Sequence, residues 1–304
     1  MEKILIALMA LGFFVSCSKD EVVKVNKHEI TFGEVFVDNA TKATDPSYGA
    51  VALTSFDVYG TITGTAGSVN IFDGVEVTGN VGDDVWSYDE QYAQYWIPKT
   101  SYIFAAVVDA NAVTKDNFHM PTALTYNTAN QKDLLFATAT ATVAADGTPS
   151  QDPINFTFSH LLSKVQFTVT SDSEGGYYHS VTGISVENYE TGTYAISSGV
   201  WTGTTVKSIS FGNIEQVTAA VGEKTNATQM LLVPNTATFN VTFTVDLYKN
   251  GVKLGTETKT VAVDNDLIKG NAYNFTIDCH VGELIQFTVT NDPAWTNGGN
   301  VTVQ

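Results

Sequence analysis

The segment FNVTFTVDLYKNGVKLGTETKTVAV, residues 239–263, decides the fold class of this chain. Apolar and polar side chains alternate on both sides of Asn250-Gly251, as they do in strands whose successive side chains point to opposite faces of a sheet. Asn-Gly between two alternating runs is the strongest short-range signal of a β-hairpin, because its tight turn requires positive φ. The segment therefore predicts two antiparallel strands.

Alternation of this kind recurs along the chain after the N-terminal segment, and no stretch of useful length shows helical periodicity. Short strands separated by Gly, Asn, Asp or Pro turns predict antiparallel β-sandwiches rather than a parallel sheet with crossover helices. The longest stretches that we expect to be irregular are residues 38–52 and 109–132. We expect strands at residues 30–37, 55–62, 102–108, 134–143, 154–158, 165–170, 181–187, 230–234, 239–248, 254–263, 273–281 and 284–290.

Length and charge limit the possible organisation and partners. A chain of 304 residues is long enough for two domains that each bury a core. The expected boundary is the polar bend at residues 159–164, which gives an N-terminal β-sandwich domain at 17–163 and a C-terminal one at 164–304. The formal net charge is −17 and the 15 basic residues are all lysines. Such a surface repels phosphate and lacks the guanidinium groups that read bases, so nucleic-acid binding is excluded.

Residues 1–16 have the pattern of a signal peptide, with Lys3 before an apolar run that is too short to span a bilayer. The run ends in Phe-Val-Ser followed by Cys17, which resembles the lipobox of bacterial lipoproteins. This pattern predicts that Cys17 becomes an acylated N-terminal residue and that its acyl chains hold the protein on a membrane. An ordinary secretion signal with an incidental cysteine is the alternative.

Two serines, a histidine and a lysine at residues 159–164 raise the possibility of a hydrolase. A Ser-x-x-Lys pair needs a helix to align its ends, whereas alternating strands flank this bend. The glycines of a nucleophile elbow are also missing. We therefore interpret the bend as structural and His160 as a hydrogen-bonded packing residue at the domain junction, and we predict that the protein is not an enzyme.

The sequence contains only weak signals of ligand-binding sites. Asp83-Asp84 and Asp264-Asn265-Asp266 offer oxygen ligands for calcium, but neither has the spacing of a calcium-binding loop, so we interpret both as solvated turns. Cys279 and His280 fall on opposite faces of a strand and cannot hold one metal ion. The aromatic residues of WSYDEQYAQYW, residues 86–96, are expected in the core, with a sugar-binding surface as the alternative. We predict neither a metal nor a cofactor.

The order of these features resembles the fimbrillin family of pilus subunits and adhesins of Bacteroidales bacteria, over essentially the whole mature chain. The resemblance is carried by lipobox Cys17, an early strand, Lys42 in ATKAT, and the segments YIFAAVV, DLLFATA, FTFSHLLSKVQFTV and YAISSGVW. Lys19-Asp20-Glu21 also resembles the export signal of surface lipoproteins in these bacteria. The most specific piece is a Phe-x-His-x-x-Ser-Lys pattern made by Phe158, His160, Ser163 and Lys164.

The resemblance implies two transthyretin-like sandwiches and export to the outer membrane as a surface lipoprotein. It also implies that a trypsin-like protease cuts after Lys42 and that the vacated groove of strand 30–37 accepts a strand from another copy or a related fimbrial subunit. The family typically has arginine at the cleavage position. An uncut, lipid-anchored tip or anchor adhesin that binds a host glycan or protein is therefore the alternative.

The C-terminal run ELIQFTVTNDPAW, residues 283–295, contains the candidate donor strand. Ile285, Phe287 and Val289 share one face of the expected strand, and Trp295 follows. An apolar strand face of this kind can fill an open trough and pair with its free amides. The same segment can instead complete its own C-terminal domain, and the sequence leaves both interpretations open.

Overall fold

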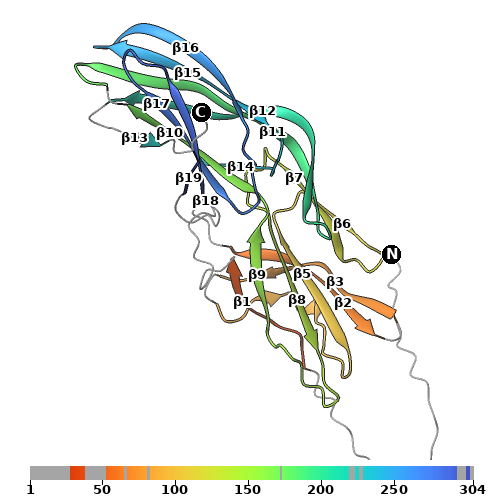
Figure 1. The fold of residues 1–304 in the computed structure, drawn as a ribbon. Helices are drawn as coiled ribbons and strands as arrows, with labels where there is room; N and C mark the ends of the chain where they lie inside the picture. Colours follow the sequence, from red (N-terminus) through yellow and green to blue (C-terminus); the bar gives the residue numbers. More distant parts are fainter. Residues whose placement is uncertain are drawn as a thin grey trace, which may run out of the picture.

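The computed structural model describes residues 28–37, 53–64, 67–80, 83–171, 173–218, 223–225, 229–292 and 299–301. The signal segment, Cys17, Lys42 and Trp295 lie outside these residues. Throughout the described part of the chain the regular structure is β, apart from one 3₁₀ turn at Glu90–Tyr92 (η1). The predicted all-β fold class is thereby confirmed. The strands form an N-terminal and a C-terminal unit that are stacked end to end in an elongated molecule (Figure 1).

The N-terminal unit is one curled sheet. Its two edges meet where Phe32 forms a bridge with Trp86, the residue before the last strand of the sheet. Alternate side chains of the sheet point inward and make a core rich in phenylalanine. In order across the sheet the strands are β1 (Phe32–Val37), β9 (Ile154–His160), β8 (Leu135–Thr142), β5 (Ser101–Val108), β2 (Ser55–Gly64), β3 (Gly67–Thr78) and β4 (Ser87–Tyr88).

The C-terminal unit consists of two sheets that enclose a second core, which includes Phe167, Phe243 and Phe275. One sheet contains β13 (Glu223–Thr225), β10 (Ser163–Ser171), β17 (Ala272–Cys279), β18 (Gln286–Asp292) and β19 (Gly299–Val301), with β14 (Met230–Leu232) also paired to β10. The other contains β16 (Val252–Val263), β15 (Phe239–Lys249), β11 (Tyr177–Ala195), β7 (Pro121–Asn127) and β6 (Ala112–Lys115), with β12 (Val200–Val217) also paired to β11.

The hairpin predicted from residues 239–263 is present as β15 and β16, and Asn250 and Gly251 have φ values of 50° and 82° at its turn. The expectation that residues 109–132 are irregular was wrong, because β6 and β7 lie there. β6 is short and largely exposed, so its sequence carries no apolar alternation. β7 pairs with β11, which places this hairpin in the sheet of the C-terminal unit although its residues precede 163.

Not every pair of strands is antiparallel, in contrast to the prediction. β1 runs parallel to β9, and β10 runs parallel to β17. Alternation indicates that a segment is a strand with one buried face, but it does not say which strand lies beside it or in which direction. β3 and β12 were also missed, and β12 is exposed along most of its length.

The two units are joined by a third apolar cluster and by polar contacts. The cluster combines Tyr59 and Val107 of the first sheet with Leu124 and Tyr126 of β7 and with Leu161 and Leu162. At the tip of the β6–β7 hairpin, Lys115 Nζ lies 2.6 Å and His119 Nδ1 lies 2.7 Å from the carboxylate of Asp73 on β3. The hairpin is therefore bonded to both units.

Candidate functional site

β1 closes the seam of the curled N-terminal sheet, and backbone hydrogen bonds hold the chain on both sides of it. On one side, Trp86 N donates to Phe32 O at 2.9 Å and Ile30 N donates to Gln94 O at 2.8 Å. On the other side, Ile154 N donates to Thr31 O at 2.8 Å and the parallel ladder with β9 continues to Val37. Without β1, both of these edges expose unpaired backbone groups, which is the condition in which a sheet accepts another strand.

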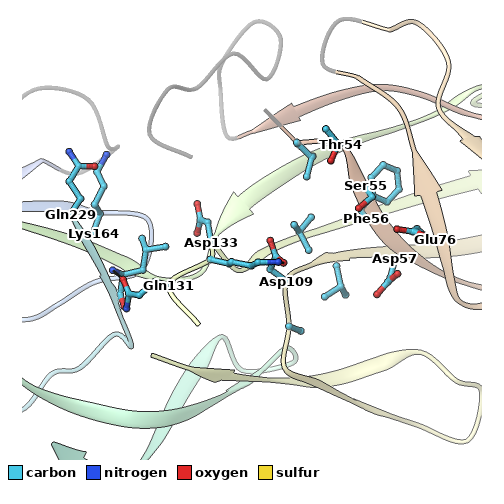
Figure 2. A pocket seen from close by; sticks show the side chains of 16 residues that line it. Thr54, Ser55, Phe56, Asp57, Glu76, Asp109, Gln131, Asp133, Lys164 and Gln229 are labelled. Atoms are coloured by element: carbon cyan, nitrogen blue, oxygen red, sulfur yellow. Dashed lines mark hydrogen bonds and ion pairs between the residues drawn. The ribbon is translucent and has the colours of Figure 1, made fainter. Parts of the chain in front are cut away.

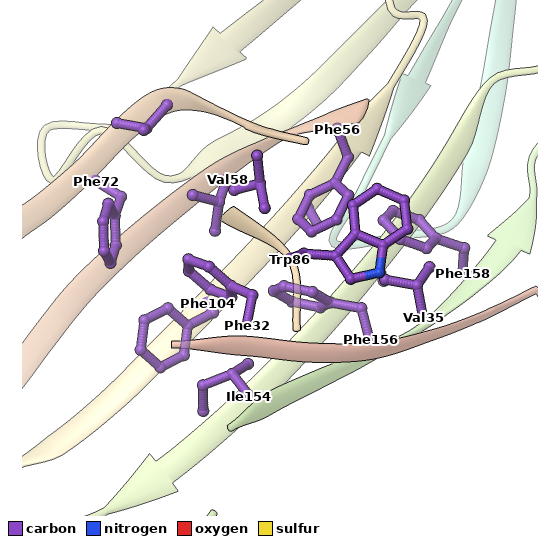
Figure 3. Close-up of a cluster of buried hydrophobic side chains, with 14 of the residues drawn as sticks. Phe32, Val35, Phe56, Val58, Phe72, Trp86, Phe104, Ile154, Phe156 and Phe158 are labelled. Atoms are coloured by element: carbon purple, nitrogen blue, oxygen red, sulfur yellow. The ribbon is translucent and has the colours of Figure 1, made fainter. Parts of the chain in front are cut away.

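The side chains of this segment fill the core of the N-terminal unit. Ile30, Phe32, Val35 and Val37 are buried. Figure 3 shows Phe32 and Val35 within this core. The Phe32 ring lies at the centre of an aromatic group, with ring centroids 5.6 Å from Phe72 and 5.9 Å from Phe156. Loss of β1 therefore leaves an apolar groove lined by phenylalanine rings, in addition to the two open edges.

A bulge interrupts β1 at Gly33. The register with β9 shifts between Phe32 and Val35, so that three residues of β1 pass two of β9. A Cβ atom at Gly33 would lie 2.3 Å from Asn155 Oδ1 and 2.5 Å from Pro153 Cγ. These distances are too short for any side chain, so the groove has room only for glycine at this position.

The C-terminal unit also contains a parallel pair of strands. β10 runs parallel to β17, as β1 runs parallel to β9. β10 also pairs with β13 and β14 on its other side, and it follows β9 after only Leu161 and Leu162. β1 is connected to β2 only through residues 38–54. A single cut in that connection would make β1 a separate piece, which is not true of β10.

The predicted donor segment lies in the core of its own unit. β18 pairs antiparallel with β17, Val289 is buried and Ile285 packs against the same core. The Phe287 ring lies 5.7 Å from that of Phe275 and 6.0 Å from that of Phe243. In this structure the segment therefore completes the C-terminal unit, which is the second of the two interpretations of its sequence.

The polar residues of the predicted junction motif are used in structural contacts. Phe158 is buried in the N-terminal core. His160 Nδ1 lies 2.5 Å from Asp133 Oδ2, and both side chains are only 2% exposed. The Ser163 hydroxyl donates to Ile268 O at 2.8 Å, and the Lys164 amide donates to Asn271 O at 3.0 Å. The arrangement links the end of β9 and the start of β10 to neighbouring loops.

A cavity of about 590 Å³ opens at the junction of the two units (Figure 2). Asp57, Glu76 and Asp109 line one side, while Lys164 and Gln229 lie on the opposite side. Lys132 Nζ lies 3.2 Å from Asp109 Oδ1. Partial burial raises the pKa of Asp57, and the negative charges of Glu76 and Asp109 raise it further. The residues that line the cavity come from segments far apart in the sequence, so no local sequence motif predicted it.

The other residues singled out from the sequence are surface turns or core. Asp83 accepts a hydrogen bond from Asn80 N at 2.8 Å, and the Asp264 carboxylate accepts one from the Thr238 hydroxyl at 3.4 Å. Trp86 and Trp96 are buried in the N-terminal core, as expected, whereas Tyr92 is exposed. Among the described residues, no three or more His, Cys, Asp or Glu side chains are grouped so that they could hold a metal ion.

Cys279 is buried in the core of the C-terminal unit, as the alternation predicts, and burial raises the pKa of its thiol to about 12. The described part of the chain contains no apolar helix of the length that a membrane span requires.

Comparison with solved structures shows that this fold is shared with proteins of the genus Bacteroides. A fimbrial protein from Bacteroides vulgatus aligns with a TM-score of 0.64 and 15% identity, over 88% of this chain and 99% of that one. Two proteins described as candidate cell adhesion proteins align similarly. The one from Bacteroides uniformis has a TM-score of 0.51 and 16% identity over 88% of this chain and 98% of its own. The one from Bacteroides ovatus has a TM-score of 0.54 and 13% identity over 91% of this chain and 99% of its own.

No sequence among the curated proteins matches this chain. A family model described as fimbrillin-like matches residues 41–293, which is most of the chain. That family consists of structural and adhesive proteins of the cell surface and not of enzymes, in agreement with the structural use of Ser163 and His160. The chain belongs to the fimbrillin-like family.

Proposed function

We propose that this protein is a fimbrial subunit that assembles when β1 is removed and a strand of another subunit takes its place. Membership of the family gives the protein a fimbrial or adhesive role at the cell surface. The single observation that supports the assembly step is the position of β1. This strand closes the N-terminal sheet on both sides and is connected to β2 only through residues 38–54.

The energetics favour a durable polymer. Four buried apolar side chains occupy the groove, and each contributes about 1.5–3 kcal/mol when it is fully buried. Together they amount to roughly 6–12 kcal/mol before the ordering of the incoming strand is subtracted. A strand that fills these positions in an emptied groove dissociates slowly, whereas a groove left open exposes apolar surface and free amides.

We further propose that the chain reaches the outer membrane surface as a lipoprotein acylated at Cys17 and that cleavage after Lys42 starts assembly. Both residues lie outside the described part of the structure, and the support comes from the sequence around them. Lysine instead of arginine at residue 42 favours a second role, in which an uncut subunit stays on its lipid anchor as a tip or anchor adhesin for a host glycan or protein.

Mass spectrometry of the N-terminus of protein isolated from cells distinguishes these two roles. A chain that begins at Ala43 supports the polymerising subunit, and an acylated Cys17 on surface-exposed protein supports the anchored one. An N-terminus at neither residue would remove both maturation schemes.

The assembly step is tested with protein in which residues 40–46 are replaced by the recognition sequence of a site-specific protease. We expect the uncut protein to remain monomeric in size-exclusion chromatography. Cut protein is exposed to mild denaturant so that β1 is released, and it should then form linear polymers that are visible by negative-stain electron microscopy. A cut protein that loses β1 and remains monomeric would contradict strand exchange.

A further inference from the structure

The cavity between the two units has the size and the position of a ligand site. Its volume of about 590 Å³ lies within the range of about 300–1,000 Å³ that is usual for small-molecule pockets. One wall comes from β2, β3 and the end of β5 in the N-terminal sheet, and the other comes from β10 and β14 in the C-terminal unit (Figure 2). Small ligands bind preferentially at such junctions, where two units contribute contacts.

The loop of residues 131–133 gives the cavity a fixed shape. Gln131 Nε2 donates to Leu231 O at 3.1 Å, and Gln131 Oε1 accepts from Leu231 N at 2.8 Å, so this side chain joins the loop to β14. The buried carboxylate of Asp133 is paired with His160. A cavity that is already shaped in the free protein loses less entropy when a ligand binds.

Polar side chains on the N-terminal wall are open to a ligand. Four of them line the cavity and make no side-chain hydrogen bond or ion pair with any described residue: Thr54, Ser55, Asp57 and Glu76. Asp57 and Glu76 lie directly opposite each other on β2 and β3, and like charges in such positions destabilise a pair of strands. The fold therefore retains two carboxylates that its own chain does not neutralise.

Hydrogen-bond donors and apolar surface complete the lining. Lys164 and Gln229 lie across the cavity from Asp57 and Glu76 (Figure 2). The apolar side chains of the lining include Leu53, Val108 and Leu231. A ligand in this cavity thus meets acceptors on one wall, donors on the other and apolar surface as well.

These features limit the class of ligand. The carboxylates of Asp57, Glu76 and Asp109 repel anionic molecules, and the described residues include no group of acidic, histidine or cysteine side chains that could hold a metal ion. The ammonium groups of Lys132 and Lys164 oppose a ligand with several positive charges. A sugar meets the remaining conditions, because each hydroxyl both donates and accepts hydrogen bonds and the C–H groups of the ring are apolar.

We propose that this cavity binds a short, uncharged oligosaccharide, whose hydroxyls bond to Asp57 and Glu76 on one wall and to Lys164 on the other. The inference rests on the proposed adhesin role, for which it supplies a ligand class and a site. It does not depend on strand exchange, because no residue of β1 lines the cavity.

The test uses the chain without residues 1–17. The probes are immobilised neutral oligosaccharides of hexose, N-acetylhexosamine and deoxyhexose units, their sialylated and sulfated counterparts, and a tetralysine peptide. Isothermal titration calorimetry then gives the dissociation constant of the strongest neutral probe for the natural chain, for Asp57→Asn and for Glu76→Gln. Glu257→Gln is the matched control, because Glu257 is exposed on β16 and does not line the cavity.

We expect binding to neutral sugars and not to the sialylated, sulfated or peptide probes. Asp57→Asn and Glu76→Gln should each weaken binding about tenfold, because hydrogen bonds to a charged acceptor are stronger than those to an amide. Glu257→Gln should change it less than about twofold. Both cavity variants should melt at the same temperature as the natural chain or higher, since they relieve the repulsion between opposed carboxylates. A loss of binding without a loss of stability separates a binding role from a structural one.

Three results would overturn the proposal. They are binding of the tetralysine peptide in place of the sugars, binding of no probe, and sugar binding that Asp57→Asn and Glu76→Gln weaken no more than Glu257→Gln does. Attachment of protein-coated beads to cultured epithelial cells tests the adhesin role separately. If beads that carry Asp57→Asn with Glu76→Gln attach as firmly as those with the natural chain, the adhesin role stands and the site is wrong. If the natural chain binds the sugar but its beads do not attach, the site stands and the adhesin role fails.

Discussion

Truncation of Phe32 to alanine tests whether β1 is held mainly by its side chains in the N-terminal core. The ring is fully buried, and its centroid lies within 6.4 Å of those of Phe56, Phe72 and Phe156. Phe→Ala substitutions in a core cost about 3–5 kcal/mol, depending on how far the site collapses. The surrounding rings belong to strands that are fixed in the sheet, so we expect about 4 kcal/mol for Phe32→Ala. In a cut chain the same loss weakens the binding of β1 roughly a thousandfold.

Urea denaturation followed by tryptophan fluorescence measures this effect, because Trp86 and Trp96 are buried in the same core as Phe32. The matched control is Phe36→Ala, which truncates the same residue type on the opposite, partly exposed face of β1. We expect the control to cost about 1 kcal/mol. If Phe32→Ala destabilises the N-terminal unit no more than Phe36→Ala does, the side chains of β1 do not hold it in its groove, and the reasoning for a replaceable strand is refuted.

Three further predictions concern contacts away from β1. His160→Ala removes the imidazole partner of the buried Asp133 carboxylate, so we expect a loss of about 3 kcal/mol and separate melting of the two units in differential scanning calorimetry; a single unchanged transition would contradict this. Partial burial opposes ionisation of Asp73, but hydrogen bonds from Lys115 and His119 lower its pKa below 3.8. The stability that ionised Asp73 contributes to the fold is therefore present above about pH 4 and is lost as the pH falls further. Because the pair is partly exposed, Asp73→Asn should cost less than about 1 kcal/mol at pH 7, and the difference from the natural chain should shrink as the pH falls below about 4 and in 1 M salt. The raised pKa of Cys279 keeps its thiol protonated at pH 8, so iodoacetamide should leave a chain lacking residues 1–17 unmodified until guanidinium unfolds it.

The sequence was sufficient for the fold class and for most strand positions, because one face of each of those strands is buried. The hairpin at Asn250-Gly251 and the inward placement of Cys279 follow directly from alternation, whereas Phe32 and Val35 both point inward only because of the bulge between them. β6 and β12 were missed because they are largely exposed and therefore lack an apolar face. The pairing of β7 with β11 and the parallel β1–β9 ladder depend on contacts between distant segments, which local patterns do not encode.

The candidate site was predictable only in part. The first strand was predicted from the sequence, but the close approach of Pro153 and Asn155 to Gly33 was not, because these residues lie 120 or more positions from Gly33 along the chain. The packing of the predicted donor segment in its own unit was not predictable for a related reason. Ile285, Phe287 and Val289 have the pattern of any half-buried strand, and only the packing of β18 on β17 shows that their own unit uses them.

The strand β11 has a mechanical consequence for the molecule. It is 19 residues long, which at 3.3 Å per residue makes it roughly 60 Å from end to end. One half of it pairs with β15 and the other half with β7, and β12 follows it along nearly its whole length. Tension applied along this strand would load many hydrogen bonds in shear at the same time, instead of opening them one after another. In a filament built from such subunits, the long paired strand inside each subunit would resist stretching, in addition to the contacts between subunits.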